Sequence, residues 1–266
     1  MPQTVVGSGI TSGNVSNVTD RRALFYDQAY AGEFPLTGKY ARAVGVFKDA
    51  GVGTLLDVGC GLGDFGRHCR RNIPGIEVKG VDVSEVAVGK ARENGMDAVR
   101  VDVGNERLPF GDDSFDGIFC GEVIEHVFDT DGLLEELRRV LRPTTPDRLC
   151  PLVLTTPNLA SWYNRIFMMF GYQPLFMEVS TRGGFGHPIP FWLNAGHIRM
   201  FTYRAIRQFV QHHGFRIQRV YSYGINTDLG YGAKHKFTAR TLNFLTAPFP
   251  GLCSDIVLVL TKQSGR

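Results

Sequence analysis

The chain has 266 residues, of which 43% are hydrophobic and 21% charged, as in an ordinary globular protein. No stretch approaches the roughly 18 uninterrupted apolar residues of a membrane-spanning helix. We also expect no secretion signal, because the N-terminus has neither a basic region nor a long apolar run. The five cysteines include no Cys-X-X-Cys pair, so we expect reduced, buried thiols and a cytoplasmic location.

The net charge of +3 hides an asymmetry between the two halves of the chain. Residues 1–150 carry 17 Lys and Arg against 23 Asp and Glu, a net of −6, whereas residues 151–266 carry 12 against 3, a net of +9. One interpretation is scattered surface arginines. The other is a C-terminal half that attracts an anionic substrate or polymer.

The first 19 residues are rich in Gly, Ser, Thr and Asn without periodicity, which predicts a flexible leader. Residues 20–266 are predicted to form a single domain. A helical pattern begins at Asp20 and is broken by Gly32 and Pro35.

Strands and helices alternate through the rest of the chain. The predicted strands are residues 54–58, 77–81, 98–101, 115–120, 152–155, 215–221 and 255–261. The predicted helices are residues 39–50, 65–71, 85–93, 131–141 and 203–213. This alternation indicates an α/β fold with a doubly wound, mostly parallel sheet.

Residues 157–200 form an aromatic-rich insertion, longer than a simple crossover needs. One interpretation is a lid whose aromatic side chains pack on the sheet. The other is a wall for a bulky acceptor. The candidate substrate residues are Trp162, Tyr163, Phe185 and Trp192 in the insertion, with Tyr26 and Tyr30 in the N-terminal helix.

The strand at residues 54–58 runs into three glycines at alternate positions, Gly59, Gly61 and Gly63, before a predicted helix. Glycine suits a backbone that must turn tightly and approach a ligand closely. A strand, glycine loop and helix in this order are typical of a nucleotide-type site. The pattern alone also fits a dinucleotide-binding loop.

Acidic residues at the ends of three strands help to distinguish the cofactors. Asp82 can accept hydrogen bonds from ribose hydroxyls, and Asp102 suits an adenine amino group. Asp57 would repel a pyrophosphate, and the glycine directly after the strand gives the pattern G-x-G-x-G. These features favour a sulfonium cofactor over a dinucleotide.

Four motifs together resemble the class I S-adenosylmethionine-dependent methyltransferases. They are Asp-Val-Gly-Cys-Gly-Leu-Gly, Val-Asp-Val-Ser, Leu-Pro-Phe with Ser-Phe-Asp, and Leu-Arg-Pro after a helix. The resemblance covers residues 38–222 and implies a seven-stranded Rossmann-like sheet whose last strand is antiparallel.

The resemblance also implies the residues that bind S-adenosylmethionine. The methionyl part would lie against Gly59, Cys60, Gly61 and Gly63, next to Asp57. Asp82 with Val83 would take the ribose, Asp102 with Val103 the adenine, and Cys120 would lie beside the cofactor.

The segment after the fourth strand carries Glu122, Glu125 and His126. In a helical turn these residues would share one face, where two carboxylates and an imidazole can hold a divalent cation such as Mg²⁺. His126 alone would suit a general base. A third interpretation is a structural Glu-His pair that supports the loop.

Glu-Val-Ile-Glu-His and Gly-His-Ile-Arg-Met-Phe-Thr also resemble two metal-dependent groups, the ubiquinone-pathway O-methyltransferases and the small-RNA 3′-terminal 2′-O-methyltransferases. In the latter group a histidine that matches His197 completes the ligand set. His197 has a simpler interpretation as a residue that precedes a helix.

We therefore expect a methyltransferase that modifies a hydroxyl group of a small-molecule, sugar or lipid-like metabolite, in secondary metabolism. The alternatives are N-methylation of an amino sugar, metal-dependent 2′-O-methylation of RNA, and cofactor binding without catalysis. The catalytic candidates are Glu125, His126 and His197.

Overall fold

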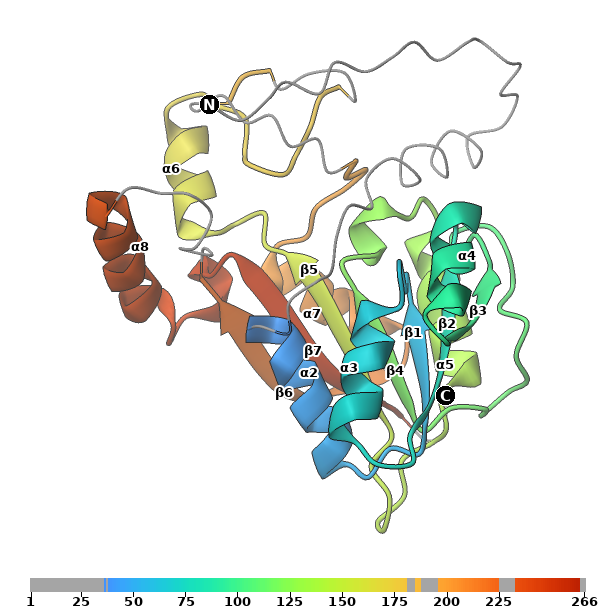
Figure 1. Cartoon of the computed structure of the whole chain (residues 1–266). Helices are drawn as coiled ribbons and strands as arrows, with labels where there is room; N and C mark the ends of the chain where they lie inside the picture. Colours follow the sequence, from blue (N-terminus) through green and yellow to red (C-terminus); the bar gives the residue numbers. More distant parts are fainter. Residues whose placement is uncertain (1–35, 37, 181–184, 188–195, 225–232, 264–266) are drawn as a thin grey trace, which may run out of the picture.

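A computed structural model describes residues 36, 38–180, 185–187, 196–224 and 233–263 (Figure 1). Its centre is a seven-stranded sheet in the order β3-β2-β1-β4-β5-β7-β6. The strands are β1 Thr54–Val58, β2 Glu77–Asp82, β3 Asp97–Arg100, β4 Gly117–Gly121, β5 Pro151–Pro157, β6 Phe215–Tyr223 and β7 Asp255–Lys262. Strands β1 to β5 run parallel, whereas β7 runs antiparallel to both of its neighbours. The predicted sheet, with its antiparallel last strand, is confirmed.

The helices are α2 Gly38–Asp49, α3 Asp64–Asn72, α4 Glu85–Glu93, α5 Thr130–Val140, α6 Trp162–Met169, α7 Tyr203–His212 and α8 Ala233–Thr246. Two single 3₁₀ turns are η1 Ile124–His126 and η2 Pro250–Leu252. Because a parallel sheet is apolar on both faces, helices cover both sides. Helices α2, α3 and α4 contribute to one buried core, and α5 and α7 contribute to the other. Figure 1 shows α2 and α3 in front of the sheet.

Local sequence explains why the helices begin where they do. The Ser84 hydroxyl accepts a hydrogen bond from the Ala87 N–H at the start of α4, and the Asp129 carboxylate accepts one from the Gly132 N–H at the start of α5. Such side chains satisfy backbone donors that the first helical turn leaves unpaired. In α5, Leu133, Leu134 and Leu137 are buried at the helical spacing that the sequence predicted.

Three elements differ from the predictions. Helix α6 lies within the insertion, where the sequence predicted no helix. Strand β4 begins at Gly117 instead of residue 115, and Phe115 forms an isolated bridge with Leu141. Helix α8 was not predicted, because its three threonines are weak helix formers and its apolar residues follow no clear stripe. The leader, the predicted helix from Asp20, Tyr26, Tyr30 and Trp192 lie outside the described residues.

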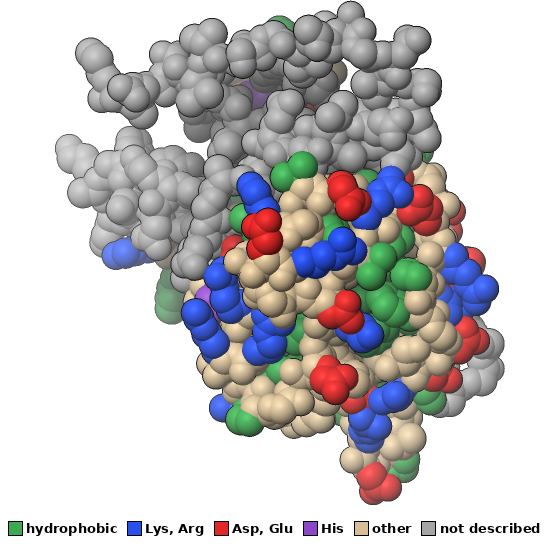
Figure 2. Space-filling model, turned by 45° about the vertical axis from the view of Figure 1, so that its right-hand side comes forward, with side chains coloured by type: hydrophobic (Ala, Val, Ile, Leu, Met, Phe, Trp, Pro, Cys, Tyr) green, Lys and Arg blue, Asp and Glu red, His purple; other side chains and the backbone are tan. Residues whose placement is uncertain are grey.

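The five cysteines are unbonded and buried, as expected. Within the described ranges, no helix is long and apolar enough to cross a bilayer. On the face in Figure 2, acidic and basic side chains are interspersed around hydrophobic ones. Charge on this face is therefore mixed.

Candidate active site

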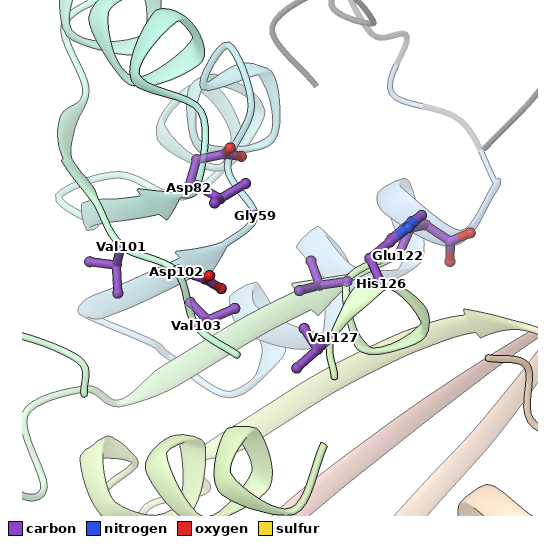
Figure 3. A pocket seen from close by; sticks show the side chains of 10 residues that line it. Gly59, Asp82, Val101, Asp102, Val103, Glu122, His126 and Val127 are labelled. Carbon is purple, nitrogen blue, oxygen red and sulfur yellow. The ribbon is translucent and has the colours of Figure 1, made fainter. Parts of the chain in front are cut away.

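A pocket lies where β1, β2 and β4 end, at the carboxyl edge of the sheet (Figure 3). This edge is where open α/β sheets place their ligands, because the loops that leave neighbouring strands diverge there. The lining residues are Gly59, Asp82, Val83, Val101, Asp102, Val103, Glu122, Val123, His126 and Val127. Figure 3 shows Asp82 and Asp102 on one side of the pocket and Glu122 and His126 on the other.

The glycine loop closes tightly over the end of β2. The N–H groups of Gly59 and Cys60 both donate to the Val81 carbonyl oxygen, at 2.8 and 3.0 Å. Gly59 has φ +71°, and a Cβ atom there would lie only 2.4 Å from Cγ2 of Val123. Glycine is therefore required at this position both by the backbone conformation and by the space.

The Asp82 carboxylate is anchored at the base of the pocket by backbone donors. Its Oδ2 accepts from the Gly61 N–H and its Oδ1 from the Ser84 N–H, both at 2.9 Å. Gly61 thus acts on the pocket through Asp82. The predicted residues Cys60, Gly61, Gly63 and Cys120 do not line the pocket, and Cys120 is fully buried.

The Asp102 carboxylate is held in a turn of its own beyond β3. Its Oδ1 accepts from the Gly104 N–H at 3.1 Å and its Oδ2 from the Asn105 side-chain amide at 2.8 Å. Val101 and Val103 flank it in the pocket wall. The pocket therefore combines an apolar wall with two carboxylates on successive strand ends.

Asp57 lies within β1 and is buried away from the pocket surface. Its Oδ2 has no hydrogen-bond partner among the described residues. Burial and the neighbouring charge of Asp82 raise the pKa of Asp57 to about 8. This shift favours the protonated form of Asp57 at neutral pH.

Glu122 does not belong to the helical turn that the sequence predicted. It has φ +56°, and the 3₁₀ turn η1 begins only at Ile124. Its Oε1 accepts from the Thr155 hydroxyl at 2.7 Å, and its Oε2 lies 2.9 Å from Nζ of Lys39. Burial favours the neutral acid, but Lys39, together with the Thr155 hydroxyl and His197, holds the pKa of Glu122 below its usual value.

Glu125, His126 and His197 do come together, although 70 residues separate the two histidines. One possible ligand atom from each lies within 4.8 Å of the others, and Glu122 is outside this group of described residues. The His126 and His197 ring centroids are 4.7 Å apart. The Ile198 and Arg199 N–H groups donate to the Glu125 carbonyl oxygen, which ties the His197 segment to η1.

Glu125 is fully buried, and only one of its carboxylate oxygens has a hydrogen-bond donor. Oε2 accepts from the Thr156 hydroxyl at 3.0 Å, whereas Oε1 has no hydrogen-bond partner in the described structure. Nε2 of His197 is 3.9 Å from Oε1. Burial and then the charge of Glu122 raise the pKa of Glu125 well above its usual value. A proton or a bound cation would relieve this buried carboxylate.

Backbone carbonyl groups orient both imidazoles. Nδ1 of His126 lies 3.2 Å from the Gly196 carbonyl oxygen, and Nδ1 of His197 lies 2.6 Å from that of Phe176. A carbonyl oxygen only accepts, so each Nδ1 carries the proton in these hydrogen bonds, and in the neutral imidazole each Nε2 then carries a lone pair. Metal-binding histidines are oriented in the same way.

The three predicted substrate residues that the structure describes, Trp162, Tyr163 and Phe185, do not line the pocket. Tyr163 is buried between Trp162 and Phe167, with ring centroids 5.6 and 6.2 Å away, and Phe185 is 60% exposed. Within the described part of the insertion, these contacts agree with the packing interpretation. Sequence reasoning missed Lys39, because nothing in the spacing places the start of α2 beside Glu122.

Residues 56–145 match the model of the methyltransferase domain family. Over 95 residues the chain is 42% identical to the methyltransferase GfsG of Streptomyces halstedii. This aligned region covers 34% of this chain and 34% of that protein. The chain thus spans about a third of the length of this curated relative.

Solved structures show the fold over nearly the whole chain. A putative methyltransferase of Haloferax volcanii, solved in complex with the Trm112 methyltransferase activator, aligns with TM-score 0.59 and 17% identity over 94% of this chain and 99% of its own. The [4+2]-cyclase SpnF aligns with TM-score 0.57 and 19% identity over 94% and 98%. Since one of these neighbours is a cyclase, the fold alone does not fix the reaction. The domain match over residues 56–145 and the fold shared with these solved structures make the chain similar to class I S-adenosylmethionine-dependent methyltransferases.

Proposed function

We propose that this chain transfers the methyl group of S-adenosylmethionine to a hydroxyl group of a small-molecule, sugar or lipid-like acceptor, with a divalent cation such as Mg²⁺ at Glu125, His126 and His197. The observation that carries the proposal is the buried Glu125 Oε1, which has no hydrogen-bond partner in the described residues and lies beside two oriented imidazoles. The acceptor class is inferred from this chemistry and from the resemblance of the motifs.

The pocket residues fit the cofactor. Asp82 and Asp102 present acceptor oxygens to ribose hydroxyls and to an adenine amino group, and Val101, Val103 and Val127 offer an apolar wall to the base. Gly59 leaves the space that a Cβ atom would fill. We propose that these residues hold the cofactor, while Asp57, Cys60, Gly61, Gly63 and Cys120 shape or support the loop.

The residues on the opposite side of the pocket fit a hydroxyl acceptor. The cofactor supplies a methyl group on a sulfonium that is already primed to leave, so the protein must chiefly orient the acceptor and take its proton. A divalent cation lowers the pKa of a hydroxyl group that it contacts. Glu125, through Oε1, and the Nε2 atoms of His126 and His197 would hold such a cation. Without a cation, Nε2 of His126 would accept the proton itself.

The proposal is tested by methyl transfer from labelled S-adenosylmethionine to defined acceptors. The panel contains hydroxylated sugars and lipids, amino sugars, and RNA with a free 3′ end. We expect methylation of hydroxylated small molecules, loss of activity in EDTA, and recovery with Mg²⁺ or Mn²⁺. Methyl transfer to amino sugars or to RNA, and not to hydroxylated small molecules, would contradict the proposed acceptor class.

Substitutions separate the cation from the general base. His197→Ala should abolish the metal-dependent activity along with cation binding, and His212→Ala, in a histidine at the end of α7, should not. Activity that survives both EDTA and His197→Ala, but is lost in His126→Ala, would contradict the cation and indicate that His126 is the general base.

A further inference from the structure

Lys39 joins two carboxylates at the edge of the candidate active site. Its Nζ lies 2.9 Å from Oε2 of Glu122 and 2.6 Å from Oδ1 of Asp255. Asp255 begins β7, which runs antiparallel to β5 and therefore starts at the carboxyl edge of the sheet. Lys39 belongs to the first turn of α2, which begins at the same edge. One ammonium group thus connects α2, the end of β4 and the start of β7.

These three side chains are shielded from solvent without being fully dry. The exposed fractions of the side chains are 15% for Lys39, 26% for Glu122 and 25% for Asp255. The two carboxylates share one ammonium, and their charges raise the pKa of Lys39 in spite of its burial. Lys39 is therefore charged under all ordinary conditions.

Three hydrogen bonds or ion pairs restrain Glu122. Its N–H donates to the Thr155 carbonyl oxygen at 3.1 Å, its Oε1 accepts from the Thr155 hydroxyl, and its Oε2 pairs with Lys39. Both carboxylate oxygens already have partners. Glu122 could enter the Glu125, His126 and His197 group only by leaving the Lys39 ammonium.

We propose that Lys39 is a positioning residue that keeps Glu122 out of the cation site. The site then offers three protein ligands and keeps its remaining positions for the acceptor and water, as catalytic metal sites do. Without Lys39, the Glu122 carboxylate moves toward the cation and adds a fourth ligand with a negative charge. The cation is then held more tightly, because affinity rises with the number of charged ligands. This inference rests on the cation in the proposed function.

The test is direct binding of Mn²⁺, followed by the electron paramagnetic resonance signal of the free ion, which needs no acceptor and no turnover. The first variant is Glu122→Gln. Because Glu122 is not a ligand in the wild-type site, this change should leave the Mn²⁺ affinity within about twofold. A loss of about tenfold or more would show that Glu122 already binds the ion and would overturn the inference.

The second arm removes the ammonium. Lys39→Met should bind Mn²⁺ at least about tenfold more tightly than the wild type, and the double variant Lys39→Met/Glu122→Gln should return to the wild-type affinity. Lys48→Met, an exposed change on the same helix, is the matched control. Equal affinity of Lys39→Met and the wild type, or a gain that persists in the double variant, would overturn the inference.

The outcomes also separate this inference from the proposed function. Binding of Mn²⁺ only by Lys39→Met, and only with Glu122 present, would support the inference and contradict a wild-type cation site. If no variant binds Mn²⁺, both the inference and the proposed cation site are wrong. Methyl transfer measured in EDTA would then still test whether the protein is a methyltransferase. Thermal unfolding shows whether each variant is folded. If Lys39→Met does not fold, the Mn²⁺ affinity of Glu122→Gln alone tests the inference.

Discussion

At the scale of single residues, the Asp82 carboxylate links the glycine loop to the pocket. It faces the pocket and at the same time accepts from the Gly61 and Ser84 N–H groups. Charge-assisted hydrogen bonds of this kind are stronger than neutral ones. The carboxylate therefore fixes both the loop and the group that a ribose would meet.

Asp82→Asn should weaken S-adenosylmethionine binding by about 10- to 100-fold, because it replaces an ionised acceptor by a neutral amide and removes roughly 1.5–3 kcal/mol. Equilibrium dialysis with the labelled cofactor measures the dissociation constant. Asp97→Asn, on the exposed edge strand β3, is the control and should bind normally. Normal affinity of Asp82→Asn would contradict the assigned role.

Asp57 predicts a pH dependence of stability. Its pKa is about 8 in the folded protein against an ordinary value of 3.8, so the folded state holds one more proton between these values. Stability must then fall as pH rises through this interval, by up to about 1.4 kcal/mol per pH unit, and level off above pH 8. The stabilising contribution of the Asp57 carboxyl group is fully present only below its ordinary pKa of 3.8.

Asp57→Asn keeps a neutral side chain of the same shape and removes this proton. In urea unfolding at pH 5, 6, 7 and 8, the variant should lose less stability with rising pH than the wild type, and should be the more stable protein at pH 8. Asp49→Asn, an exposed change in α2, should keep the wild-type slope. Identical slopes for Asp57→Asn and the wild type would show that Asp57 is ionised in the folded state.

At the scale of elements, the glycine loop lies closely against the segment after β4. A Cβ atom on Gly59 would lie 2.4 Å from Val123, and Gly59 has φ +71°. Gly75 has a similar φ of +77° but nothing within 4 Å of its virtual Cβ atom. The two glycines separate the cost of the backbone conformation from the cost of the clash.

Gly75→Ala should destabilise the protein by about 1–2 kcal/mol, the cost of a left-handed conformation, and Gly59→Ala should cost more. Adding Val123→Ala to Gly59→Ala should recover the extra loss of stability that the clash causes. The loss caused by the left-handed backbone conformation should remain. Chemical denaturation of the four proteins measures these free energies. Equal losses for the two glycine variants would contradict the close contact.

The same elements show what sequence could predict. The strand ends at Asp57, Asp82 and Asp102 follow from apolar runs and glycine loops, which are local signals. Glu122 was misjudged because its left-handed φ follows from its bonds with Thr155 and Lys39, which lie far away in the chain. The pairing of His126 with His197 depended on family resemblance, since spacing carries no information about contacts across 70 residues.

At the scale of the whole molecule, the sheet brings distant segments to one edge. The pocket takes residues from the ends of β1, β2, β3 and β4, and Lys39 and Asp255 approach from α2 and β7. The residues proposed to bind the cofactor lie on the β1 to β3 side, and those proposed to act on the acceptor lie beyond β4. This division agrees with the family match, which covers residues 56–145 and ends before the His197 segment.

The central claim is that this pocket binds S-adenosylmethionine, and calorimetric titration tests it most directly. The protein should bind one equivalent of S-adenosylmethionine and give no heat of binding with NAD. S-adenosylhomocysteine should compete with S-adenosylmethionine for the same site. Binding of NAD without binding of S-adenosylmethionine would contradict the account.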